Sequence, residues 1–139
     1  AALKLPPGTS ITNPVDAPVG TLQQEDGRVA EKILEAIYGS GRPDALVMHL
    51  NLAAFAGRTK DEVLDNLVQA ALRVQGRYPG QAHFVLVLRS DGEPALEERK
   101  RAFRARAVAL GIPVYDEIAN AGAALAALAF HERFVRARS

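Results

Sequence analysis

Short apolar runs alternate along this chain with stretches whose apolar residues recur at helical spacing, and this alternation constrains the fold more than any other feature. Residues 45–50 and 83–88 form nearly continuous apolar runs, which are typical of strands buried on both faces of a parallel sheet. Shorter runs lie at 9–15 and 112–115. Each run precedes a helical stretch, and this order predicts right-handed crossovers. We therefore expect a three-layer α/β fold, with helices on both faces of a mostly parallel sheet of about four strands.

Four helices are expected, and local signals mark their ends. The first covers residues 28–38. The second begins at Thr59 and Glu62, spaced as a capping box in which each side chain satisfies a free backbone N–H. The third begins near Pro94, because proline suits the first position of a helix. The last is rich in alanine and follows Asp116, which is expected to be its N-cap.

One hydrophobic core is expected to join these elements. Its predicted members are Leu46, Val47, Leu67, Leu72, Val85, Leu86, Phe103 and Leu125. The third helix also carries a basic stretch at 99–106, which we interpret as a solvent-facing surface. Its acidic residues come first, and their spacing allows an ion pair between Glu97 and Arg101.

Length and composition exclude several classes of protein. The 139 residues suffice for one domain, residues 1–139, and hardly for two. The charges nearly cancel, at +1, so no nucleic-acid partner is expected. No apolar stretch approaches the roughly 20 residues that span a bilayer, so no membrane association is expected either. The absence of cysteine excludes a disulfide framework, a thiolate zinc site and a cysteine nucleophile, and it fits a cytoplasmic protein.

The first residues predict that the chain is a fragment of a larger protein. It opens with Ala1-Ala2-Leu3, and its one methionine is Met48. No signal-peptide pattern accounts for this start. The remaining part is expected on the N-terminal side.

In an open α/β sheet the ligand site lies beyond the carboxyl ends of the strands. Three segments are expected at that edge: residues 13–16, 51–57 and 89–92. Pro14 makes a rigid corner between Asn13 and Asp16, whose side chains can bind backbone N–H groups. Asn and Asp are also ordinary turn residues, and local sequence alone favours the simpler role of closing a turn.

No catalytic residue and no metal site are predicted. Residues 90–92 precede a helix and could hold an anion on free N–H groups, but they lack the spacing of nucleotide motifs, so helix capping is favoured. The three histidines have no neighbours at metal-ligand spacing. His49 is expected in the core, His83 lies in a strand, and His131 is expected to be exposed.

Three segments carry a family resemblance: residues 5–16 (LPPGTSITNPVD), 44–48 (DALVM) and 111–115 (GIPVY), the last followed by the alanine-rich helix. They are similar to segments of the CoA-ligase domain of ADP-forming acyl-CoA synthetases, which are relatives of succinyl-CoA synthetase. The likeness covers nearly the whole chain. It implies a flavodoxin-like domain that is one piece of a multidomain enzyme.

Enzymes of this family join a carboxylate to coenzyme A through an acyl phosphate and a phosphohistidine, coupled to a nucleotide. The resemblance implies CoA, ATP and magnesium for the complete enzyme and none bound by this chain alone. It implies CoA-binding and ATP-grasp domains as partners. No histidine here stands in the family's phosphohistidine context. The loops facing phosphate would contain Asn13, Asp16, Asn51, Ala53, Ala54 and Gly57.

Two features depart from the family. The strand and Gly-rich turn that usually open the domain have no counterpart in this chain, and the loop at 52–57 is bulkier than the family's glycine-containing loop. A sheet short of an inner strand would expose edges, which predicts either a homo-oligomer or a chain that needs upstream residues to behave as a monomer. Two alternatives stay open: a non-catalytic subunit-interaction module, and a ligand-binding domain of the same fold.

Overall fold

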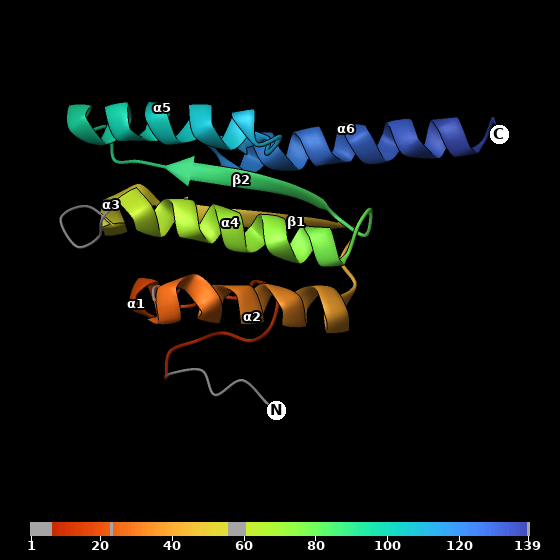
Figure 1. Ribbon diagram of the computed structural model, residues 1–139. Coiled ribbons are helices and arrows are strands. Elements are labelled where there is room, and N and C mark those ends of the chain that lie inside the picture. Colours follow the sequence, from red (N-terminus) through yellow and green to blue (C-terminus); the bar gives the residue numbers. More distant parts are fainter. Residues whose placement is uncertain (1–6, 23, 56–60, 139) are drawn as a thin grey trace. The chain divides into compact units, whose positions relative to one another are not determined.

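The computed structural model describes residues 7–22, 24–55 and 61–138, and it confirms the α/β class (Figure 1). The chain divides into two compact units. The first comprises Ala1–Pro43 and Ala54–Ala82, and the second comprises Asp44–Ala53 and His83–Ser139. No helix within these described ranges has the length and apolar character needed to cross a membrane.

The first unit is helical. Its main helices, α2 (Arg28–Ala36) and α4 (Asp61–Arg77), pack against each other. Each buries a stripe of apolar residues spaced three or four apart, as expected for a helix with one covered face. The buried residues are Val29, Ala30, Ile33 and Leu34 in α2, and Leu64, Leu67, Val68, Ala71 and Val74 in α4. The unit also contains α1 (Val19–Leu22), the 3-10 turn η1 (Gln24–Gly27) and the π-helical turn η2 (Ile37–Gly41). Thr59 of the predicted capping box lies outside the described residues.

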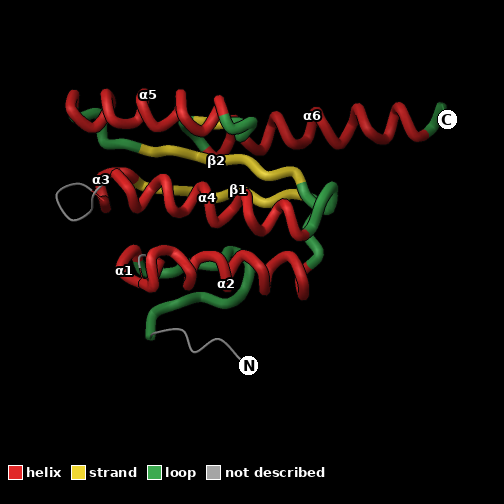
Figure 2. Tube along the Cα trace, in the orientation of Figure 1, coloured by secondary structure: helices red, strands yellow, loops and turns green. Residues whose placement is uncertain are grey.

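The second unit holds the sheet. Strands β1 (Ala45–Asn51), β2 (His83–Arg89) and β3 (Val114–Tyr115) are parallel and lie in the order of the sequence. Figure 2 shows β1 and β2 side by side, and their register pairs Val47 with Val85 and Asn51 with Arg89. Short helix α3 (Leu52–Phe55) follows β1 directly.

Two long helices complete this unit. Helix α5 (Pro94–Ala109) connects β2 to β3 and starts at Pro94, as predicted. It ends in a left-handed Gly111, where the amides of Gly111 and Ile112 bond back to the carbonyls of Val108 and Ala107. Helix α6 (Ile118–Arg136) packs its first half on the sheet. Its Ala121 and Leu125 join a cluster with Val85, Val87 and Tyr115.

The expected first strand at 9–15 does not belong to the sheet. Ser10 and Asp16 instead form an isolated antiparallel bridge that closes a small loop. Ile11 and Val15 are 77% and 38% exposed, so the segment has no apolar face to bury against a sheet, and Pro14 lacks an N–H for a strand ladder. Among the described residues the sheet therefore has three strands, and the expectation of about four is wrong.

Strand β1 is also not buried on both faces, as its apolar sequence predicts. Leu46 and Leu50 are buried, but Val47 is 40% exposed and His49 is exposed. Residues paired in parallel register share a face, so these two side chains lie on the face that α6 covers over β2 and β3. Because β1 is an edge strand, α6 leaves them open. The placement of His49 in the core is wrong, whereas β2 is buried from Phe84 to Leu88, as predicted.

Most of the eight predicted core residues are buried or half-buried. Leu46, Leu67, Val85, Leu86 and Phe103 are buried. Leu72 and Leu125 are half-buried, and Val47 is the one predicted core residue that is exposed.

Candidate functional site

The candidate site lies in the second unit, at the edge where its three parallel strands end. Asn51 closes β1, Ser90 follows β2, and Asp116 follows β3. Ligands of open α/β sheets bind at this edge. Its polar groups therefore decide what chemistry the unit can perform.

Asn51 and Ala53 are brought together here. The Asn51 side-chain oxygen accepts a hydrogen bond from the Ala53 amide at 3.2 Å, so Asn51 starts α3 through an Asx turn. Ala53 is half-buried and Ala54 is exposed within α3. Gly57 lies outside the described residues.

Asn13 and Asp16 share a loop in the first unit, and both are exposed. The backbone amide of Ser10 donates to the carbonyl of Asp16 at 2.9 Å, and the amide of Asp16 donates to the carbonyl of Ser10 at 3.2 Å. This backbone pairing matches the turn-closing role. The predicted convergence of this loop with the residues after β1 stays a prediction.

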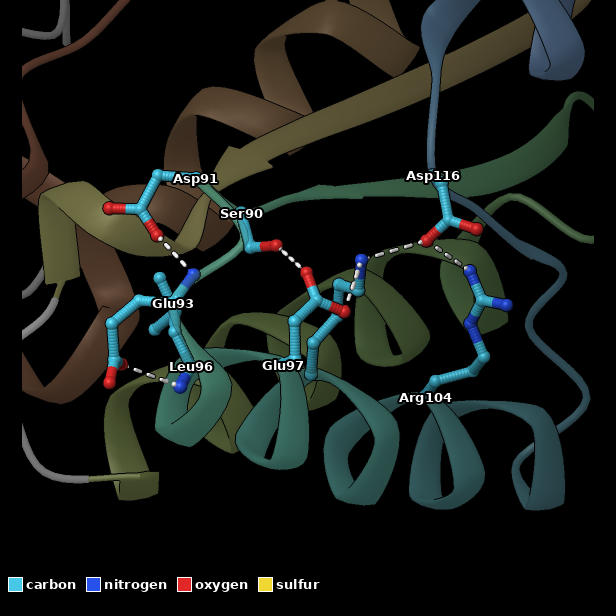
Figure 3. A network of polar contacts seen from close by, with 8 residues as sticks. Ser90, Asp91, Glu93, Leu96, Glu97, Arg104 and Asp116 are labelled. Atoms are coloured by element: carbon cyan, nitrogen blue, oxygen red, sulfur yellow. Dashed lines mark hydrogen bonds and ion pairs between the residues drawn. The ribbon is translucent and has the colours of Figure 1, made fainter.

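The N-terminus of α5 is capped by the chain's own carboxylates: Glu93 is the N-cap, one residue after the predicted segment 90–92, and Asp91 of that segment supports it. The Glu93 amide donates to Asp91 Oδ1 at 3.1 Å, and the Leu96 amide donates to Glu93 Oε2 at 3.0 Å (Figure 3). Pro94 has no N–H. Two anionic side chains thus occupy a helix end that would otherwise attract phosphate. A phosphate group does not fit this terminus.

A chain of charged contacts ties the ends of β2 and β3 to α5 (Figure 3). Ser90 Oγ donates to Glu97, whose other oxygen lies 3.0 Å from Lys100 Nζ. Lys100 also lies 3.2 Å from Asp116, which accepts from Arg104 at 2.7 Å. The Lys100 side chain is only 14% exposed, so this network is partly sheltered from water.

The network keeps its members ionised. The hydrogen bond from Ser90, then that from Lys100, lowers the pKa of the Glu97 carboxyl. Burial opposes ionisation of Asp116, but hydrogen bonds from Arg104 and Lys100 overcome it and lower its pKa. Burial likewise opposes the charge of Lys100, and hydrogen bonds to Glu97 and Asp116 raise its pKa. Groups held this way position loops well but make poor proton donors or nucleophiles at neutral pH.

Two sequence predictions about these residues are wrong. Asp116 is not the N-cap of α6: Glu117 occupies that position without a side-chain cap, because Arg104 and Lys100 engage the Asp116 carboxylate. Glu97 pairs with Lys100, not Arg101. The spacing of Lys100 and Arg104, one turn apart on α5, was the signal for a shared acidic partner.

The histidines build no site of their own. His83 Nε2 lies 2.8 Å from Glu132 Oε1 of α6, and His131 is exposed, as predicted. Across the ranges that the structure describes, no three His, Asp or Glu residues cluster to hold a metal ion.

Comparison of the chain with protein-family models, with curated proteins and with solved structures found no match.

Proposed function

We propose that the chain is a flavodoxin-like accessory domain of an ADP-forming acyl-CoA synthetase, and that other domains of that enzyme perform the chemistry. The observation that carries this proposal is the sheet itself. Its sequential order matches the last three strands of the flavodoxin-like order 2-1-3-4-5. In that order an inner strand lies beside the first of these three, and at that position β1 has no paired strand among the described residues and has a half-open face.

The polar edge of the sheet suits a supporting role. Glu97, Lys100, Arg104 and Asp116 bind one another and so hold the loops after β2 and β3 in place. In the proposed enzyme, the CoA-binding and ATP-grasp domains would hold CoA, ATP and magnesium and supply the phosphohistidine. This chain would contribute loops that contain Asn13, Asp16, Asn51, Ala53, Ala54 and Gly57, and it would act in the cytoplasm.

The test is reconstitution. The 139-residue chain is mixed with CoA-binding and ATP-grasp domains of ADP-forming synthetases encoded by the same genome, together with ATP, magnesium, CoA and short carboxylic acids. Consumption of the CoA thiol is followed over time. We expect acyl-CoA only when this chain is added to the other domains. An unchanged rate with and without the chain would contradict the proposal.

A second function, that of a subunit-interaction module, is favoured by one observation. The C-terminal half of α6 exposes large apolar side chains, including Phe130 at 67% and Phe134 at 46%. Reconstitution separates the two functions, because a pure interaction module would bind a partner without restoring turnover.

A further inference from the structure

Helix α6 has one face on the sheet and an opposite face in solvent. Ala121 and Leu125 belong to the covered face. Figure 1 shows the last turns of α6 extending past the start of β2, and the side chains from Arg133 to Arg136 are exposed. Glu132 of α6 is bonded to His83 at the start of β2.

The solvent face of α6 carries a regular apolar seam, which we name the outer seam: Ala123, Ala127, Phe130 and Phe134. At about 100° per residue, these four lie within an arc of roughly 60° on the side opposite Ala121. All four are exposed. Their spacing of four, three and four residues is that of a helix seam that packs on another helix.

The seam is complementary to itself in one orientation. It has two small residues toward its N-terminal end and two large residues toward its C-terminal end. When two copies of α6 run antiparallel, Ala123 lies opposite Phe134 and Ala127 lies opposite Phe130. Each phenylalanine ring then packs on an alanine methyl group, and a single two-fold axis relates the contacts in the two halves of the interface.

Charge favours the same orientation. Glu117 precedes α6, next to an Asp116 carboxylate that Lys100 and Arg104 already hold, whereas Arg133, Arg136 and Arg138 stand at the C-terminal end of α6. An antiparallel pair places the acidic end of each helix beside the basic end of the other and also opposes the helix dipoles. A parallel pair would instead place the three C-terminal arginines of one copy beside the same three arginines of the other copy. The Arg138 guanidinium lies over the Phe134 ring, 4.1 Å from its centre, so the other face of that ring is the one left for the partner.

We propose that a second copy of this chain docks on the outer seam, so that two α6 helices pair antiparallel and form a symmetric dimer. In it, Phe130 packs on the partner's Ala127 and Phe134 packs on the partner's Ala123. This dimer does not depend on the proposed synthetase role, and it uses a surface other than the free edge of β1.

The first test measures the mass of the 139-residue chain by sedimentation equilibrium. We expect a dimer for the natural sequence and a monomer for Phe130→Glu. The matched control is Val108→Glu, which places the same charge on an exposed residue of α5, 54% accessible, and should leave the dimer intact. Circular dichroism checks that each variant is folded. Should Phe130→Glu not fold, Phe130→Ala is used and is expected to weaken dimerisation at least tenfold.

The second test fixes the orientation through engineered disulfides, because the chain has no cysteine of its own. Ala127→Cys lies near the two-fold axis and should form a disulfide-linked dimer. Ala123→Cys should not, because an antiparallel pair separates the two copies of that residue by about 16 Å along the helix axis. A monomeric natural chain, a dimer that survives Phe130→Glu, or rapid cross-linking of Ala123→Cys would each overturn the proposal.

Discussion

Tyr38 is the largest fully buried side chain among the described residues, with 1% of its surface exposed. Its ring lies against Tyr78, with 5.6 Å between the ring centres. Burial raises the pKa of the Tyr38 phenol above its ordinary value of 10.0. The folded state therefore holds this proton more tightly than the unfolded state does.

The first prediction concerns alkaline stability. The contribution of Tyr38 is complete below pH 10 and is lost as the pH rises toward its raised pKa in the folded protein. Tyr38→Phe should therefore lose less free energy of unfolding between pH 9 and pH 11 than the natural chain does. Urea titrations at the two pH values measure this. Tyr115→Phe serves as the control and should keep the full alkaline loss. An equal loss in Tyr38→Phe would contradict the assignment.

The second prediction concerns Asp16 and rests on the proposed function. Two anions repel, so Asp16 is expected to orient its loop and not to contact phosphate. In the reconstituted enzyme, Asp16→Asn should lower turnover with little change in CoA affinity. Asp44→Asn, an exposed change outside the candidate loops, is the control. A weakened CoA affinity at unchanged turnover would contradict this role.

At the scale of single residues, sequence predicted those roles that depend on neighbours in the chain. The supporting hydrogen bond to Asp91, the start at Pro94 and the exposed His131 follow from the local sequence, which did not single out the cap residue Glu93. Asp116 could not be assigned in this way. Its partners stand 12 and 16 residues earlier, and only the fold brings them to its carboxylate.

Among the helices, α2 and α4 are linked by ion pairs of Glu31. Its carboxylate, on α2, lies 2.8 Å from Arg73 and 2.6 Å from Arg77 of α4. Hydrogen bonds from these two arginines lower the pKa of Glu31 from its ordinary value of 4.5. The stabilisation is thus present above pH 4.5 and is lost as the pH falls through the lowered pKa of the folded state.

The third prediction follows from this contact. Glu31→Gln should lower the free energy of unfolding at pH 7 by up to about 1 kcal/mol, and the difference should shrink below pH 4. Urea titrations at pH 7 and pH 3 measure both values. Glu98→Gln, an exposed change on α5, should alter neither. A destabilisation by Glu31→Gln that is as large at pH 3 as at pH 7 would exclude an ionic cause.

The fourth prediction compares two valines that pair in the sheet. Val47 of β1 is 40% exposed, and Val85 of β2 is 4% exposed. Val85→Ala should lower the free energy of unfolding by about 2 kcal/mol, because it removes two buried methyl groups and leaves a cavity. Val47→Ala should stay within about 0.5 kcal/mol. Thermal and urea unfolding of both variants measure this contrast, and equal costs would contradict the edge position of β1.

Whole helices and strands could be predicted where the spacing of apolar residues within the element itself indicates its type. The helices α2, α4, α5 and α6 and the strands β1 and β2 all lie where their periodicity indicated. Two outcomes escaped prediction because they depend on neighbours. The apolar sequence of β1 does not reveal that it lies at an edge, and the segment at 9–15 has the composition of a strand without an apolar face to bury.

The fifth prediction belongs to the whole molecule. By itself the chain should form no acyl-CoA and accept no phosphate from ATP, because the proposed enzyme keeps its phosphohistidine and nucleotide site on other domains. Incubation with radiolabelled ATP, CoA and short carboxylic acids, followed by gel analysis, tests this. Stable label on a histidine of the chain would contradict both the prediction and the proposed role.

The chain passes between its two units three times, after Pro43, after Ala53 and after Ala82. This interlacing sets an order of events on the ribosome. Strand β1 ends at Asn51 and its partner β2 begins only at His83, so at about 5–20 residues per second β1 waits roughly 2–6 s for β2. Helix α4 is complete at Arg77, before β2 begins, so α2 and α4 can pack on each other before β2 emerges. Of the two units, the helical one is thus the first that the nascent chain can complete, while β1 is still without β2.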